Sequence, residues 1–268
     1  MTPRVPIRML TAVFAIVAVG ITCSCSRQAA HRPAERRAPQ GKRQAVRPAT
    51  TATDAVDGES ILGRPIIETE FGKGPRRVLY VGGVHGSEYG TDVARRFVAF
   101  LESHPESIPD DVHIDVVECA NPDGYAADTK GNGRHVDINR NFPTSGWRRA
   151  IMHGRSSGKA PASEPETRLL LKELREKPDV VVSLHSQGGI IDPDGTFSWP
   201  VARRMAARTG WSVVNVGDDG AIRGSLGHYV AERMKTPMVT VELQSPKLTP
   251  PVTEALLEAA RTGPVKSK

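Results

Sequence analysis

The chain has 268 residues, of which 38% are hydrophobic and 25% are charged, a composition typical of a globular protein and unlike that of a fibrous or fully disordered chain. Its formal net charge of +6 arises entirely in residues 1–58, which carry nine Lys and Arg against three Asp and Glu, whereas residues 59–268 carry 27 of each kind. With a neutral folded part and only 5% aromatic residues, the sequence offers no surface suited to a phosphate backbone, so no nucleic-acid partner is expected.

The first 26 residues predict a signal peptide. Two arginines precede an uncharged apolar run over residues 9–21, which is shorter than the roughly 20 residues that a helix needs to span a bilayer. Cys23 and Cys25 follow, where bacterial lipoproteins carry their lipid-modified cysteine, although neither is preceded by the usual Leu-x-small residues. We expect an exported protein of the periplasm or cell envelope, either attached to the membrane through a lipidated cysteine or released by simple cleavage of the signal.

Residues 27–58 predict a disordered basic tether, because they are rich in Ala, Arg, Pro, Gln and Thr and lack apolar periodicity. The folded catalytic domain is expected over residues 59–268. Its one cysteine, Cys119, has no partner within that range, so a structural disulfide is not expected.

Strand and helix patterns alternate along the rest of the chain. Strands are predicted at Val78–Val81, Val112–Glu118, Val180–Leu184, Ser212–Val216 and Met238–Leu243. Helices are predicted at Tyr89–Glu102, Val201–Arg208, Leu226–Met234 and Thr253–Arg261, with a turn at Asn121–Gly124 and a Ser163-x-x-Glu166 capping box before the apolar-periodic Leu169–Leu174. This alternation predicts an open α/β sheet with helices on its faces, in which ligand sites lie at the carboxyl ends of strands.

Polar clusters fall at these predicted strand ends. His85 and Glu88 follow the first strand in a glycine-rich stretch, and their spacing can direct one nitrogen and one carboxylate to a single metal ion. His185 closes a later strand. Taken singly, the first pair is more often an ordinary polar loop, and a lone histidine at a strand end is more often structural. Together, His85, Glu88 and His185 are the three-ligand set of a catalytic zinc with one open position.

Two further sites carry candidate functional groups. Glu242 lies inside an apolar strand, where a carboxylate must be paired, bound to a metal or functional, and a buried salt bridge is the simplest alternative. The run 137–143 is dense in polar side chains, and Arg140 with Asn139 can bind a carboxylate through two hydrogen bonds. A solvated loop is the default interpretation of such a run.

These motifs, in this order, resemble those of the zinc carboxypeptidase family. The matching motifs are His85-x-x-Glu88, Asn121–Gly124, Asn139–Phe142, Ser163–Thr167, Ser183–Ser186 and Glu242. The resemblance covers about residues 60–262, which is nearly all of the expected domain. It implies an open, mixed and twisted α/β sheet with helices on both faces.

The resemblance also implies a role for each matched residue. His85, Glu88 and His185 would bind one zinc ion per chain. Glu242 would act as general base on the attacking water and then pass the proton to the leaving amine. Asn139 and Arg140 match the pair that binds the carboxylate of the released residue.

Two departures from the family pattern concern the catalytic centre. The arginine that polarises the scissile carbonyl is replaced by Lys130, which keeps the charge but loses the planar fork, and the neighbouring Arg134 is an alternative substitute. The tyrosine that closes over substrate in pancreatic-type members has no clear match, since Tyr229 is nearby but at the wrong offset.

Within the family, the stretch 82–88 and the short domain look most similar to bacterial murein peptide amidases, which cut the amide between γ-D-glutamate and diaminopimelate. The resemblance thus implies a peptidoglycan-derived peptide as substrate. Two alternatives stay open: an N-acyl amino-acid deacylase of the aspartoacylase-like type, which shares the zinc ligands and base, and a non-catalytic envelope binding module. The module would be expected to lack a ligand or the base, and neither is missing.

Overall fold

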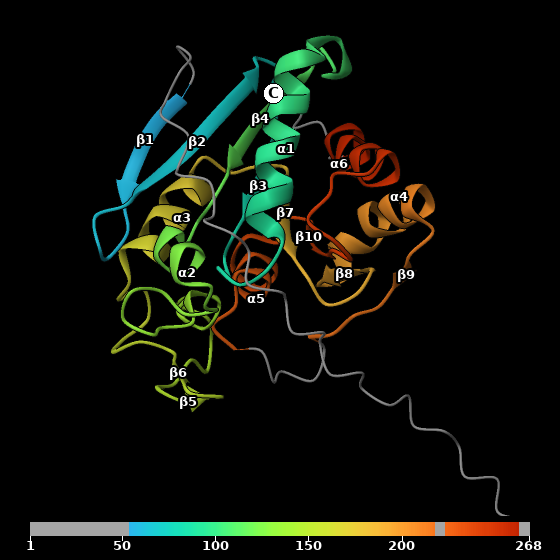
Figure 1. The fold of residues 1–268 in the computed structure, drawn as a ribbon. Helices are drawn as coiled ribbons and strands as arrows, with labels where there is room; N and C mark the ends of the chain where they lie inside the picture. The colour runs from blue at the N-terminus through green and yellow to red at the C-terminus, as the bar shows by residue number, and fades with distance from the viewer. Residues whose placement is uncertain (1–53, 218–222, 263–268) are drawn as a thin grey trace, which may run out of the picture. The chain divides into compact units, whose positions relative to one another are not determined.

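The computed structural model describes residues 54–217 and 223–262 (Figure 1). The predicted signal peptide and residues 27–53 of the predicted tether lie outside the described residues. Residues 54–58 belong to strand β1 (Asp54–Glu59), which pairs antiparallel with β2 (Pro65–Gly72), so the folded part has begun by Asp54 rather than at residue 59. None of the helices in these two described ranges is both long and apolar enough to cross a membrane.

The described residues form one large mixed sheet of eight strands in the order β1-β2-β4-β3-β7-β10-β8-β9. Its four central strands are parallel to one another. They are β4 (Val112–Val117), β3 (Arg76–Gly82), β7 (Val180–His185) and β10 (Met238–Glu242). On the far side of β10, β8 (Ile190–Asp194) runs antiparallel to it and pairs with the short β9 (Ser212–Val213).

Helices cover both faces of this sheet, because the central strands are apolar on both sides. On β3, Val78 and Tyr80 pack on one face with the helices α1, α4 and α6, whereas Leu79 and Val81 pack on the other face with α3 and α5. The helices are α1 (Gly90–Ser103), α3 (Pro165–Arg175), α4 (Trp199–Thr209), α5 (Leu226–Tyr229) and α6 (Pro250–Thr262). The predicted α/β class with helices on both faces is confirmed (Figure 1).

The remaining elements are short and lie in the connections. They are the helix α2 (Pro122–Ala127), the hairpin β5 (Ile151–Met152) and β6 (Arg155–Ser156), the 3-10 turns Pro105–Ser107, Ile138–Arg140 and Thr196–Ser198, and the π-helical turn Val230–Met234. The π-helical turn continues α5, so the helical run predicted over 226–234 is present as one run of two kinds of turn.

Three local predictions need correction. The predicted Ser163–Glu166 capping box is wrong, because α3 begins after Glu164 with Pro165 in its first turn and has no side-chain cap. The Glu166 carboxylate instead accepts hydrogen bonds from the Asn132 side chain and from the amide of Ile61. The predicted turn after residue 120 is a short helix capped by the Asn121 side chain. The strand predicted at 212–216 ends at residue 213.

Candidate metal centre

The carboxyl ends of three parallel strands bring the candidate ligands together. The loop that follows β3 carries His85 and Glu88, and β7, the direct neighbour of β3, ends at His185. On the other side of β7, the register of β10 places Glu242 opposite His185. All four side chains are buried. The four residues therefore converge at one edge of the sheet, as the strand pattern predicts.

Glycines shape the loop between β3 and α1. Gly83 adopts a φ of +65°, a left-handed conformation that residues with a side chain rarely adopt. A Cβ on Gly86 would overlap the backbone of Gly124 in α2. The chain can therefore make this turn, and press against α2, only with small residues at these two positions.

Glu88 lies between the two histidines. Its Oε1 is 2.9 Å from Nδ1 of His85, and its Oε2 is 2.8 Å from Nδ1 of His185. One ligand atom from each of the three residues lies within 4.8 Å of the other two. The imidazole rings stand edge to face, with centroids 4.9 Å apart. Two imidazole nitrogens and a carboxylate thus face a common point.

The charges at this point favour a cation. Burial opposes ionisation of His85, but the charges of Glu88 and Asp137 outweigh it and raise the histidine pKa to about 9. Burial likewise opposes ionisation of Glu88, yet the two histidines hold its carboxyl pKa well below its usual range. A buried carboxylate facing two imidazole nitrogens is the donor set that Zn²⁺ takes in three-ligand catalytic sites. The residues present therefore fit a zinc ion.

Asp137 orients one of the ligands. Its Oδ1 is 3.0 Å from Nε2 of His85, on the side of the ring away from Glu88. A carboxylate in this position fixes which ring nitrogen carries the proton and so leaves the other free to bind metal. Burial opposes ionisation of Asp137, but His85, Arg140 and Arg155 lower its pKa to about 2. Asp137 is not among the site residues predicted from the sequence, although it is the first residue of the polar run 137–143.

Glu242 is 8% exposed and lies at the end of β10 beside His185. Its Oε2 has no hydrogen-bond partner among the described residues. Burial raises the pKa of this carboxyl, and the nearby His185 only partly offsets that effect. The buried salt bridge considered from the sequence is not formed within the described part of the chain, and one oxygen of this carboxylate has no hydrogen-bond partner there.

The two candidate cations lie in different places. The Lys130 ammonium is 2.8 Å from Oε1 of Glu88, so its charge lies at the rim of the metal centre. The Arg134 side chain is 51% exposed and its guanidinium lies 3.9 Å from Glu164. Of the two residues, the structure brings only Lys130 to the candidate ligands.

Asn139 and Arg140 lie in the 3-10 turn that follows Asp137. The Asn139 side chain accepts a hydrogen bond of 2.9 Å from the amide of Leu226, at the start of α5, and the Arg140 guanidinium donates to the Asn139 carbonyl at 2.7 Å. Both residues are partly exposed. The ring of Tyr229 packs on Phe142, with centroids 5.9 Å apart.

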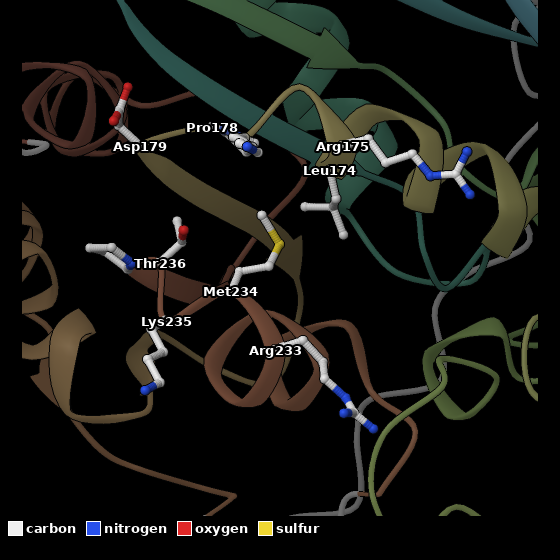
Figure 2. A pocket seen from close by; sticks show the side chains of 10 residues that line it. Leu174, Arg175, Pro178, Asp179, Arg233, Met234, Lys235 and Thr236 are labelled. Atoms are coloured by element: carbon white, nitrogen blue, oxygen red, sulfur yellow. The ribbon is translucent and has the colours of Figure 1, made fainter. Parts of the chain in front are cut away.

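A pocket of about 570 Å³ lies at the opposite end of the same strands (Figure 2). Its lining includes Pro178, which comes just before β7, and Pro237, which comes just before β10. The charged side chains of Arg175, Arg233 and Lys235 point away from one another, so they do not converge on a ligand (Figure 2). None of the predicted site residues lines this pocket, and the candidate site remains the one at the carboxyl ends.

Comparisons with known proteins point to one family. A family model described as zinc carboxypeptidase matches residues 42–200, which include the three candidate ligands but not Glu242. Murein peptide amidase A of Escherichia coli (strain K12) is 32% identical over 147 residues, or 48% of this chain and 57% of that protein. Murein peptide amidase A of Vibrio campbellii is 30% identical over 205 residues, or 69% of this chain and 77% of that protein. The match thus spans little more than half the length of the Escherichia coli relative.

A solved structure supports the same fold. The crystal structure of a murein-tripeptide amidase from Escherichia coli O157 matches with a TM-score of 0.63 and 23% identity, covering 81% of this chain and 95% of that chain. At this level of identity the likeness establishes the shared fold.

Proposed function

Because the chain belongs to the zinc carboxypeptidase family, a family of hydrolases, we propose that it is a zinc-dependent metallopeptidase that hydrolyses an amide bond next to a carboxylate-bearing residue of murein peptides. The observation that carries this proposal is the buried group of His85, Glu88 and His185 with Glu242 beside it. These groups supply a three-ligand metal centre and a candidate base at one edge of the sheet.

His85, Glu88 and His185 would hold the zinc ion, and Asp137 would keep the His85 ring in its orientation. Bound zinc would supply a Lewis acid for the scissile carbonyl and would lower the pKa of a water molecule.

Glu242 is the proposed general base. Its Oε2, which has no hydrogen-bond partner among the described residues, would take a proton from the attacking water while the water oxygen bonds to the carbonyl carbon. The same carboxyl then gives this proton to the leaving nitrogen as the carbon–nitrogen bond breaks. A carboxyl whose pKa burial has raised is better suited to this exchange than a fully solvated one.

Lys130, Asn139 and Arg140 are proposed to position the substrate. The Lys130 ammonium, which lies beside Glu88, would stabilise negative charge on the carbonyl oxygen in the transition state. Arg140 and Asn139 would bind the free carboxylate of the released residue through charge-assisted hydrogen bonds.

The names of the relatives support murein peptides as the substrate class. The sequence of residues 1–26 supports export, with Cys23 or Cys25 as the point of lipid attachment. Fractionation of cells that produce the full chain tests this location. We expect the protein in the envelope fraction, and a protein found only in the cytoplasm would contradict export.

The activity is tested with the tripeptide L-alanyl-γ-D-glutamyl-meso-diaminopimelate and the purified protein loaded with zinc. We expect mass spectrometry to detect free diaminopimelate, a strong chelator to stop its release, and added zinc to restore it. His185→Ala should abolish both zinc binding and hydrolysis, whereas His104→Ala, which alters an exposed histidine at the far end of α1, should do neither. Hydrolysis that persists in the chelator, or cleavage of N-acyl amino acids in place of the tripeptide, would refute the proposal.

A further inference from the structure

The small hairpin of β5 and β6 is separate from the large sheet and lies at the periphery of the fold (Figure 1). It belongs to the stretch 143–163, which carries four Lys and Arg but neither Asp nor Glu. Residues 59–268 as a whole carry equal numbers of basic and acidic side chains. The positive charge of this stretch is therefore a local feature, and none of the residues assigned to the proposed function belongs to it.

The hairpin has a fixed shape. The two residues of its turn, His153 and Gly154, have φ values of 50° and 75°, and positive φ at both positions is the type I′ geometry that suits a two-residue hairpin. At its root, Ser156 forms a bridge with Val136 and accepts a hydrogen bond of 2.8 Å from the amide of Asp137. A two-stranded hairpin alone is only marginally stable in water, so these root contacts hold it in place.

The tip of the hairpin is apolar and exposed. Ile151 is 79% exposed, more than any other large hydrophobic side chain of the described residues, and the adjacent Met152 is 44% exposed. Successive residues of a strand point to opposite faces, so neither face of the tip is covered by the described part of the chain. Single exposed apolar residues are common, but two adjacent ones at the end of a fixed hairpin indicate a contact surface.

Three basic side chains flank this tip. Arg148 and Arg149 come just before β5, Lys159 comes shortly after β6, and all three are exposed. Within the described ranges, none of these three flanking cations forms an ion pair with an acidic side chain. Arg155 differs from them, because it is 28% exposed and its Nε lies 3.9 Å from Asp137. The flanking cations are thus available to an external anion.

The combination of an apolar tip and flanking cations restricts the partner. The tip requires an apolar phase, and the cations require a negatively charged surface directly above that phase. A bilayer that contains anionic phospholipids supplies both, since lipid phosphates lie over the acyl chains. A hydrophilic acidic polymer, such as murein itself, would attract the cations but would offer no apolar phase to Ile151 and Met152.

We propose that this hairpin docks the protein on a bilayer containing anionic phospholipids, with Ile151 and Met152 inserted at the interface and the flanking cations at lipid phosphates. A contact of this size gives weak and reversible binding. Asp137, which contacts the root of the hairpin, also lies 3.0 Å from His85, so docking would bring the metal centre near the membrane surface. The inference concerns a surface that hydrolysis does not use, so it does not depend on the proposed function.

The test places a polarity-sensitive dye on the tip of the full chain. Cys23→Ser and Cys25→Ser remove the N-terminal thiols, Cys119 is buried, and Met152→Cys provides the labelling site. The control carries Phe197→Cys instead, at another hydrophobic position that is 52% exposed. Vesicles contain phosphatidylglycerol and phosphatidylcholine brominated on its acyl chains. Bromine quenches only a dye that enters the bilayer, so attachment through the N-terminal segment alone gives no signal.

We expect these vesicles to quench the dye at residue 152 but not the dye at residue 197, and vesicles of brominated phosphatidylcholine alone to quench neither strongly. Ile151→Ser should lower the ratio of inserted to free tip by roughly 10-fold, because the apolar contact is lost. Arg148→Gln combined with Arg149→Gln should lower this ratio by roughly 30-fold, or about fivefold for each charge. These side chains are exposed, so the melting temperature of the variants should not change.

A matched control removes two charges elsewhere. Arg175→Gln combined with Lys177→Gln alters exposed residues of the pocket at the opposite end of the strands and should leave the quenching unchanged. Equal quenching at residues 152 and 197, equal quenching by neutral and anionic vesicles, or no effect of Ile151→Ser would overturn the proposal. Purified murein that changes the emission of the dye at residue 152, without any quenching by brominated lipid, would assign the hairpin to the wall polymer and overturn it as well.

Discussion

Replacing Glu242 with glutamine separates the chemical step from metal binding. Glutamine has nearly the shape of glutamate but cannot take a proton from water. Because Oε2 of Glu242 has no partner among the described residues, the substitution breaks no hydrogen bond of that atom there, and the neighbouring His185 keeps its place at the end of β7. We therefore expect Glu242→Gln to fold normally and to retain one zinc per chain.

The expected loss lies in kcat. A positioned general base contributes about 10²- to 10⁴-fold to the rate, which corresponds to roughly 2.7–5.5 kcal/mol of activation free energy. Steady-state release of diaminopimelate from the tripeptide measures kcat, and elemental analysis measures zinc. Glu106→Gln, at an exposed position of the first 3-10 turn, is the matched control and should keep wild-type turnover. Near-normal turnover of Glu242→Gln with zinc bound would refute the assignment of the base, and loss of zinc would make Glu242 part of the metal site instead.

Three further substitutions test the neighbouring groups. Asp137→Asn keeps an acceptor for Nε2 of His85 but removes the charge, so it should weaken zinc affinity by about 10- to 100-fold in a chelator competition. An unchanged zinc affinity would show that Asp137 does not affect metal binding by His85. Amidating the substrate carboxylate should lower kcat/KM of the wild type by roughly 30- to 150-fold but that of Arg140→Ala only slightly, and equal cleavage of both substrates by the wild type would exclude a carboxylate clamp. Burial and the charge of Asp192 raise the pKa of Asp194, the last residue of β8, to about 7. The free energy that this carboxyl contributes to stability is therefore greatest at low pH and is lost as the pH rises through 7. Asp194→Asn should thus raise the melting temperature at pH 8 by at least about 2–4 °C, corresponding to about 1 kcal/mol, and by less at pH 5, whereas a lower melting temperature at pH 8 would contradict the raised pKa of this carboxyl.

The sequence was most informative where apolar strands run straight into polar residues. The runs at Val78–Val81, Val180–Leu184 and Met238–Leu243 are β-branched and apolar, so the central parallel strands and the polar residues at their ends could be predicted together. Because parallel neighbours end at one edge, polar residues at strand ends could be expected to meet there, but the adjacency of β3 and β7 that joins His85 to His185 is known only from the fold.

The edge strands were harder to predict because their residues are not typical of strands. β2 includes glutamates, and β8 has the sequence Ile-Ile-Asp-Pro-Asp, in which Asp and Pro disfavour sheet structure. β8 forms because it pairs with β10. On its other side, β9 pairs only with Ile190 and Ile191 of β8, so Pro193 lies where β8 has a neighbouring strand on one side alone, a position that tolerates proline. The position of Asp194, the last residue of β8, could not be predicted for the same reason, since it depends on the pairing of β8 with β10.

Tertiary contacts also decided local features that a short pattern cannot contain. The spacing of Ser163 and Glu166 predicted a cap, but Glu166 instead accepts hydrogen bonds from Asn132 and Ile61, which are distant in sequence. Likewise, the contact between Asp137 and His85 joins residues 52 positions apart. The sequence put Lys130 in the place of the family's arginine and left Arg134 as an alternative, and the folded chain places Lys130 beside Glu88.

X-ray absorption spectroscopy of the purified protein, combined with its zinc content, tests the metal centre most directly. The account predicts one zinc ion per chain, with two imidazole nitrogens and carboxylate oxygen in its coordination shell, and loss of this signal in His185→Ala. A protein that hydrolyses murein peptides without a stoichiometric metal ion, or whose zinc keeps the same coordination in His185→Ala, would contradict it.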